Sequence, residues 1–151
     1  MKWLIENGLF MDEEVFECAA SNGDLEFMKY LYKKNCPFGR LTFTRAALHG
    51  DLGNMIWLYE KKCPFGECTF WLARYGDIEN MKWLHEKGCP WDEGTFCMAT
   101  IHGDIDILEW LYEKGCPWGK KLFRASKNGY PSIKDNVYQW LQEHDSPLAQ
   151  N

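Results

Sequence analysis

Apolar and polar positions along the chain follow the three-to-four-residue spacing of helices. In residues 103–118, the apolar residues Ile105, Leu108, Trp110 and Leu111 fall on one side of a helical projection, and charged residues fill most positions between them. This spacing predicts an amphipathic helix, because residues three and four apart share a helix face. A strand would need apolar residues at every second position, so the pattern argues against β structure.

Residues that favour a helix start and a helix end mark the limits of this predicted helix. Asp104 is placed to cap the first turn, because its carboxylate can accept from free backbone amides there. Gly115 can adopt the left-handed conformation that ends a helix, and Pro117 prevents its continuation. At the equivalent step of two earlier copies stand Asn35, the next-best left-handed residue, and Lys62. We therefore expect a strained or differently built helix end at Lys62.

The same pattern recurs at intervals of 27, 26 and 27 residues. Three markers share these intervals: a Gly-Asp pair, a Cys-Pro pair, and a phenylalanine seven residues after each of those cysteines. They stand at Gly23, Gly50, Gly76 and Gly103; at Cys36, Cys63, Cys89 and Cys116; and at Phe43, Phe70, Phe96 and Phe123. The chain is therefore interpreted as one repeat domain, residues 1–145, with a short tail, 146–151. Its units are a half unit, 1–13, and units 14–38, 41–65, 68–91, 94–118 and 121–143.

Each unit is predicted to be a helical hairpin. A first helix of about eight residues, such as 42–49, precedes a tight turn at glycine, and a longer antiparallel helix follows. A column of alanines in the first helices (Ala19, Ala46, Ala73, Ala99 and Ala125) lets two helices approach closely. In the last unit four extra residues predict a longer closing helix that includes Ile133 and Leu141. One hairpin cannot bury its apolar columns alone, so the prediction is an all-α fold, an α-solenoid of stacked hairpins.

Residues 95–100 (Thr-Phe-Cys-Met-Ala-Thr), 103–108 (Gly-Asp-Ile-Asp-Ile-Leu) and 113–116 (Glu-Lys-Gly-Cys) resemble the ankyrin repeat, whose pattern reads T-P-L-H-L-A-A-x-x-G-H-L-E-I-V and then G-A-D. The Cys-Pro-Trp or Cys-Pro-Phe ending resembles the short atypical ankyrin repeats of giant DNA viruses. The resemblance implies protein partners bound on a concave face. The family unit is 33 residues long, and the residues missing here imply β-hairpin fingers that are shortened or absent.

Composition and charge narrow the function classes. The net charge of −5 argues against a nucleic-acid binder, which needs a basic face. No window holds the roughly 18 apolar residues of a membrane helix, and the start of the chain turns polar too soon for a signal peptide. We therefore expect a cytoplasmic protein (host cytoplasm if viral). Its seven cysteines are then not expected to form a disulfide framework and need another explanation.

The cysteines and histidines are better explained by structural roles than by metal binding or catalysis. The Cys-Pro cysteines are predicted to be small buried apolar residues, and Cys18, Cys68 and Cys97 to pack on or beside first helices. The alternative is a metal held by Cys63, Cys68 and His85, for which a second close pair is missing. His49 and His102 stand beside aspartates, as a base and its orienting group would, but capping aspartates and surface histidines explain them. No catalytic motif is present, so we expect no enzyme, metal or cofactor.

Columns that vary between units are the candidates for partner binding. They are the two residues before each glycine and the loop that enters each first helix. The candidate residues are Leu48, His49, Trp71, Arg74, Tyr75, Ile101, His102, Arg40, Glu67 and Glu93. Trp71, Arg74 and Tyr75 have the composition of an interface hot spot. The alternative is that Trp71 fills space left by a one-residue deletion in its unit.

Two alternatives concern the ends of the chain. Trp3, Leu4 and Phe10 begin halfway through a unit, so an uncovered N-terminal end would favour self-assembly, as a homo-oligomer or a virion component. The basic cluster Lys120, Lys121, Arg124 and Lys127 is either a solvated cap or a site for an acidic partner.

Overall fold

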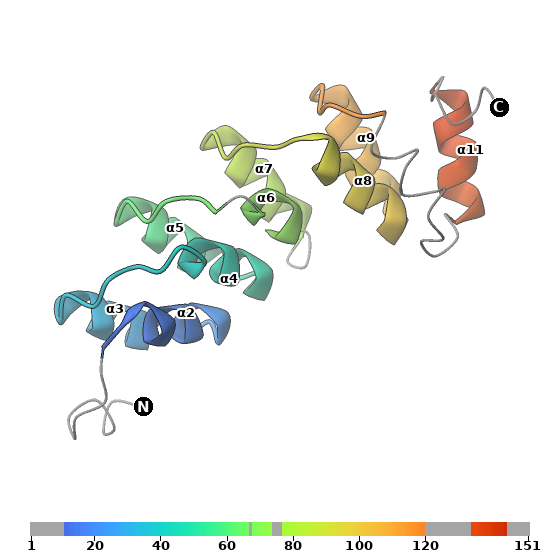
Figure 1. Ribbon diagram of the computed structural model, residues 1–151. Helices are drawn as coiled ribbons and strands as arrows, with labels where there is room; N and C mark the ends of the chain where they lie inside the picture. Colours follow the sequence, from blue (N-terminus) through green and yellow to red (C-terminus); the bar gives the residue numbers. More distant parts are fainter. Residues whose placement is uncertain (1–10, 67, 74–76, 120–133, 145–151) are drawn as a thin grey trace. The chain divides into compact units, whose positions relative to one another are not determined.

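The computed structural model describes residues 11–66, 68–73, 77–119 and 134–144 (Figure 1). These residues are all-helical, and no strand occurs among them, which confirms the predicted all-α class. The chain forms two compact units, Met1–Cys89 and Pro90–Asn151. We call them unit 1 and unit 2 and describe each by itself.

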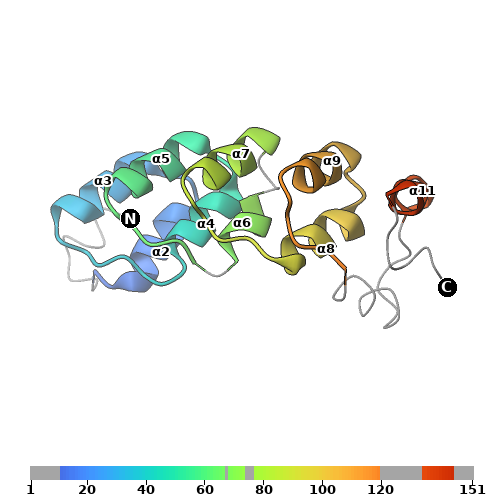
Figure 2. The same ribbon diagram turned by 90° about the horizontal axis from the view of Figure 1, so that it is seen from above.

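Unit 1 consists of helical hairpins stacked on one another. Its first helices are α2 (Glu13–Ser21), α4 (Thr42–His49) and α6 (Thr69–Leu72), and its second helices are α3 (Leu25–Lys33), α5 (Leu52–Glu60) and α7 (Ile78–Glu86). The first helices pack against each other in sequence, α2 on α4 and α4 on α6, and each packs on its own second helix. Seen from above, α2, α4 and α6 form one row and α3, α5 and α7 a second (Figure 2).

Unit 2 holds one further hairpin and a closing helix. In it α8 (Glu93–His102) packs on α9 (Ile105–Glu113), and α11 (Asp135–Glu143) follows. The Trp140 ring of α11 lies 6.1 Å from the ring centroid of Phe96 and 5.7 Å from that of Tyr112. Aromatic contacts therefore attach the closing helix to the α8–α9 hairpin.

The predictions of helix length hold only in part. The second helices α3, α5, α7 and α9 have nine residues each, so α5 and α7 are longer than their first helices α4 and α6, which have eight and four. In the other two hairpins the second helix is not longer, because α2 has nine residues and α8 has ten. The closing helix α11 also has nine residues, because the chain is extended at Lys134 and the helix begins only at Asp135. The four extra residues of the last unit therefore do not lengthen α11.

The helix starts follow the sequence signals. In each of four second helices the aspartate of Gly-Asp accepts a hydrogen bond from the backbone amide three residues on, at 2.9 to 3.2 Å; these aspartates are Asp24, Asp51, Asp77 and Asp104. The preceding glycine adopts a left-handed conformation, with φ of +67° at Gly23, +89° at Gly50 and +76° at Gly103. The three of these turns whose glycine the structure describes are therefore built from the same two residues.

The helix ends explain why Lys62 is strained. At Cys36, Cys63, Cys89 and Cys116 the backbone amide donates to the carbonyl five residues earlier, at 2.9 to 3.0 Å. This bond requires the preceding residue to be left-handed. Asn35 meets this requirement at φ +58°, and Lys62 at φ +60°, although its Cβ makes that conformation costly. The strain predicted at Lys62 is confirmed, and the helix end is built there as elsewhere.

The core consists of columns of equivalent residues that recur from repeat to repeat. The phenylalanines of the first helices and the alanines beside them are at most 2% exposed; they are Phe16, Phe43, Phe70, Phe96, Ala19, Ala46, Ala73 and Ala99. Phe123, Ala125, Trp3, Leu4, Phe10 and the basic cluster lie outside the described residues. No helix in the described ranges has the length and apolar character to cross a membrane.

Buried asparagines connect neighbouring hairpins of unit 1. The Asn54 side chain in α5 donates to the carbonyl of Gly23, 3.1 Å away, and Asn80 in α7 donates to that of Gly50 at 2.7 Å. Both asparagines are 2% exposed. The second helices α5 and α7 are thereby tied to the turn of the hairpin before each of them.

Candidate functional site

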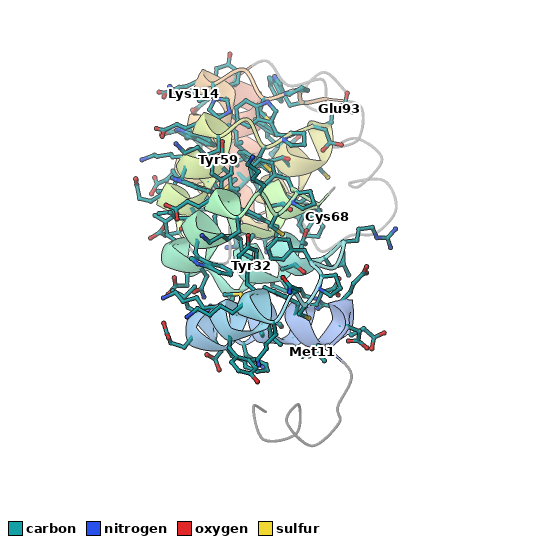
Figure 3. The ribbon with its side chains drawn as sticks, turned by 90° about the vertical axis from the view of Figure 1, so that its left-hand side faces the viewer. Met11, Tyr32, Tyr59, Cys68, Glu93 and Lys114 are labelled. Carbon is teal, nitrogen blue, oxygen red and sulfur yellow. The ribbon has the colours of Figure 1, made fainter. Side chains whose placement is uncertain are left out.

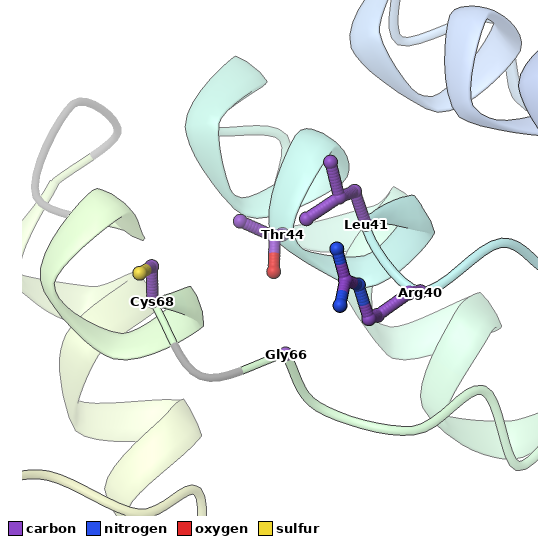
Figure 4. A pocket seen from close by; sticks show the side chains of 5 residues that line it. All are labelled: Arg40, Leu41, Thr44, Gly66 and Cys68. Atoms are coloured by element: carbon purple, nitrogen blue, oxygen red, sulfur yellow. The ribbon is translucent and has the colours of Figure 1, made fainter.

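The exposed surface of α2, α4 and α6, which we call the first-helix face, carries two hollows in unit 1. The hollow between α4 and α6 has about 150 Å³ and is lined by Arg40, Leu41, Thr44, Gly66 and Cys68 (Figure 4). The hollow between α2 and α4 is wider, at about 410 Å³, and is lined by Glu14, Glu17, Cys18, Ser21 and Arg45. The two hollows follow each other along the row of first helices.

Contacts between repeats hold the walls of these hollows in place. The Glu17 carboxylate of α2 accepts from the backbone amide of Leu41 at 2.9 Å. A Cβ at Gly39 would collide with that carboxylate, so a larger residue there would force the Glu17 side chain to move. In the next repeat, Gly66 stands at the position equivalent to Gly39, and the Thr44 hydroxyl occupies the space that a Cβ on Gly66 would need. The same hydroxyl lies 2.9 Å from the Thr69 hydroxyl.

The charge on this face changes from helix to helix. Glu13, Glu14 and Glu17 make α2 acidic, whereas Arg40 and Arg45 make the start of α4 basic. Neither arginine forms an ion pair with any part of the chain that the structure describes. Both guanidinium groups are exposed and can donate to a carboxylate brought by another molecule.

The structure places some of the predicted binding residues on this face. Arg40 lines the narrower hollow, Leu48 and His49 end α4, and Trp71 lies half-buried on α6. Glu93, Ile101 and His102 belong to α8 in unit 2, and Glu67, Arg74 and Tyr75 lie outside the described residues.

His49 has a packing role as well as an exposed position. Its imidazole lies where a Cβ on Gly23 would stand, so the ring covers the turn of the preceding hairpin. The Lys134 side chain covers Gly103 in the same way in unit 2. The prediction of a surface histidine is confirmed for His49 and His102, which are both exposed.

The hollows also contain residues that the sequence interpretation missed. Thr44 and Arg45 of α4 belong to columns that vary between repeats as freely as the chosen ones. Glu17, Thr44, Trp71 and Cys97 occupy one such column, and Cys18, Arg45, Leu72 and Met98 the next. The same test of variation, applied to every position of the first helix, would have found them.

The cysteines fall into two groups. The four Cys-Pro cysteines and Cys97 are buried, as predicted, but Cys18 and Cys68 are exposed in the hollows, so the packing role predicted for these two is wrong. Burial raises the pKa of the Cys63, Cys89 and Cys116 thiols to about 12 and raises the pKa of Cys36.

A metal-binding cysteine acts as the thiolate, whereas burial favours the protonated form of these thiols. Cys63 is buried with its proton retained, whereas its proposed co-ligand Cys68 is exposed. Within the described ranges, no group of three or more histidine, cysteine, aspartate or glutamate residues is arranged to hold a metal ion.

Comparison of the chain with protein-family models, with curated proteins and with solved structures finds no match.

Proposed function

We propose that this chain is a short-repeat, ankyrin-like α-solenoid that binds another protein through its first-helix face and has no catalytic activity or cofactor. The recurrence of the Gly-Asp and Cys-Pro markers and the stacked hairpins of unit 1 support the repeat architecture. The absence of strands among the described residues fits repeats with reduced fingers. The resemblance to giant-virus repeats and the free cysteines support a cytoplasmic location, in a host cell if the chain is viral.

The observation that carries the binding proposal is the pair of exposed arginines before and within α4, which form no ion pair with the described residues. Arg40 lines its hollow with Leu41 and Gly66, whereas Arg45 shares its hollow with Ser21 and with the carboxylates of Glu14 and Glu17, with which it forms no ion pair. Arginine and aromatic side chains contribute most of the energy of many interfaces, and Trp71 lies on the adjacent helix. A partner that places carboxylates over α4 would satisfy both guanidinium groups.

Variation between repeats points to the same face. Phenylalanine, alanine and cysteine columns that build the core stay constant, whereas the columns of Thr44 and Arg45, which line the hollows, have a different residue in each of the four described repeats. A scaffold requires constant positions only where helices pack. The first-helix positions of unit 1 are therefore free to match one particular partner.

The test is capture followed by measurement on purified components. A partner retained from lysate is purified and titrated against the wild type and the triple variant Arg40→Ala, Arg45→Ala, Trp71→Ala. We expect binding to weaken at least tenfold in that variant, as for loss of hot-spot residues. The control variant, Lys29→Ala with Lys82→Ala, changes second helices and is expected to bind as the wild type does.

Two further measurements test the predicted hot spot and the alternative of self-assembly. The variant Trp71→Ala, Arg74→Ala, Tyr75→Ala tests the predicted hot spot: partner capture that survives with helicity intact removes that hot spot from the proposal. Light scattering over a range of concentrations tests self-assembly, and a concentration-dependent oligomer would favour a structural role over partner binding.

A further inference from the structure

A second surface of unit 1 carries an ordered aromatic group on the second helices. Tyr32, near the end of α3, is 41% exposed. Its ring stacks with Phe38 of the following Cys-Pro-Phe loop, with 5.8 Å between centroids and 23° between planes. It also meets Trp57 of the next hairpin edge-on at 5.7 Å. The ring is therefore fixed between two hairpins while part of it faces solvent.

The arrangement recurs one hairpin further along the chain. Tyr59 is 40% exposed, stacks with Phe65 at 5.9 Å and 23°, and meets Trp83 edge-on at 5.5 Å. Tyr32 and Tyr59 lie one beyond the other on the same side of the unit (Figure 3). Two equivalent phenol groups thus face outward at the spacing of the repeats.

Each of these tyrosines has a lysine from the next hairpin over its ring. The Lys61 ammonium nitrogen lies 5.6 Å from the Tyr32 centroid, and that of Lys87 lies 6.0 Å from the Tyr59 centroid. Each hairpin step therefore presents one part-exposed tyrosine with one ammonium group over its ring. We call these two pairs the Tyr-Lys edge.

The charge at this edge is unbalanced. Elsewhere on the second helices Lys29 pairs with Glu26 at 2.8 Å, and Lys82 with Glu79 at 2.7 Å. The five lysines at the helix ends form no ion pair with the described residues; they are Lys33, Lys34, Lys61, Lys62 and Lys87. Only two acidic residues, Glu60 and Glu86, are adjacent to them in the sequence. A protein of net charge −5 thus carries a basic stripe here.

We propose that the Tyr-Lys edge binds an extended acidic peptide segment of a partner protein. Ammonium and phenol groups both donate hydrogen bonds, and a carboxylate accepts several at once. Repeats about 10 Å apart match about three residues of an extended chain at about 3.3 Å each. The matching segment carries an acidic residue at every third position.

The packing of the rings argues against nucleic acid as the occupant. Single-stranded nucleic acids bind by stacking bases on open aromatic faces. Tyr32 is already in contact with Phe38, Trp57 and Lys61, so its ring does not offer an open face on which a base could stack. This surface lies on the second helices, so peptide binding there does not depend on partner binding at the first-helix face.

The test uses a twelve-residue probe peptide with glutamate at every third position and serine or glycine between. Titration against the full chain is expected to give saturable binding. The variant Lys61→Gln, Lys87→Gln should weaken it by roughly tenfold or more, since each lost partner donates to a charged group. The variant Tyr32→Phe, Tyr59→Phe keeps the rings and should weaken binding by a smaller factor.

The matched control is Lys29→Gln with Lys82→Gln, which removes the same charge from the same rows of helices. Circular dichroism checks that every variant remains folded. The proposal is overturned if the probe does not bind, if the control weakens binding as much as the edge variant, or if single-stranded RNA or anionic vesicles bind the edge more tightly than the peptide does.

Discussion

The side-chain amide of Asn54 donates to the backbone carbonyl of Gly23 over 3.1 Å, across the boundary between two repeats. Asn80 makes the same bond to Gly50 at 2.7 Å. The acceptor is in each case the residue that forms the tight turn, so one side chain satisfies the turn and fixes the next hairpin against it. These bonds give unit 1 a polar link in addition to its apolar columns.

Replacing either asparagine should therefore destabilise unit 1. Asn54→Ala or Asn80→Ala leaves a part-buried carbonyl without its partner, which costs about 1–3 kcal/mol in free energy of unfolding. Urea denaturation followed by circular dichroism measures this loss. Asn22→Ala, at an exposed position, is the control, and a loss no larger than that of the control would contradict the role assigned to the bond.

Gly23 and His49 form a second link, which a pair of substitutions can separate. Gly23→Ala adds a Cβ that collides with the His49 ring and also strains a residue at φ +67°, so we expect a loss of more than about 2 kcal/mol. Gly88→Ala, at φ +75° with no atom within 4 Å of the added Cβ, measures the strain alone.

The variant Gly23→Ala, His49→Ala removes the collision but not the strain. Its unfolding free energy should lie below that of His49→Ala by about the loss measured for Gly88→Ala. If Gly23→Ala alone costs no more than Gly88→Ala, then His49 does not cover the turn as described.

The strained helix end at Lys62 offers a stabilising substitution. Lys62→Gly should raise the free energy of unfolding by about 1 kcal/mol, because glycine adopts φ +60° without the steric cost of a Cβ. Lys61→Gly is the control: its φ is −82°, so glycine there gains nothing and should destabilise. Thermal and urea unfolding compare the two, and a destabilised Lys62→Gly variant would contradict the assignment.

Thiol chemistry should divide the seven cysteines by burial. In the native protein at pH 8, a disulfide reagent should modify Cys18 and Cys68 rapidly, while the buried thiols react only on unfolding. The variant Cys18→Ser, Cys68→Ser should lose the rapid phase and keep its helicity. A rapid phase that persists in this variant would show that the buried thiols are accessible.

The same burial predicts a stability loss in alkali. The pKa of Cys63, Cys89 and Cys116 rises from 9.0 to about 12 on folding, so between these values the native state holds protons that the unfolded state has released. The thiol contribution is complete below pH 9 and declines as the pH rises toward 12. Cys63→Ala should show a shallower decline over this range.

The sequence predicted the helices well where a local signal sets them. Aspartate caps, left-handed residues before the Cys-Pro pairs and apolar columns act within one hairpin, so Asp104, Gly115 and the first helix 42–49 were located from spacing alone. The structure places the end of α4 at His49, the predicted boundary. Local signals also identified Lys62 as the strained helix end.

What the sequence could not provide depends on contacts between repeats. The link from Asn54 to Gly23 spans 31 residues, and the approach of Glu17 to Gly39 spans 22, so neither follows from local periodicity. The hollows themselves arise between helices and could not be predicted, but Arg45 and Thr44 were missed for another reason. The variation test was applied to the residues before each glycine and to the entering loops, where it found Arg40, and not to the middle of the first helices. The length of α11 was misjudged because extra residues can extend a loop as easily as a helix.

The account depends most on the claim that successive 27-residue units stack through equivalent contacts, and one deletion tests it directly. Removing residues 39–65 joins Phe38 to Gly66 in register, so Glu17 should meet Gly66 and Asn80 should donate to Gly23. Removing residues 39–58 breaks that register and serves as the control.

Far-UV circular dichroism during urea unfolding is the measurement. We predict that the 27-residue deletion keeps the helical signal per residue and unfolds cooperatively, whereas the 20-residue deletion loses both. Equal loss of helical signal and cooperativity in the two deletions would contradict the account.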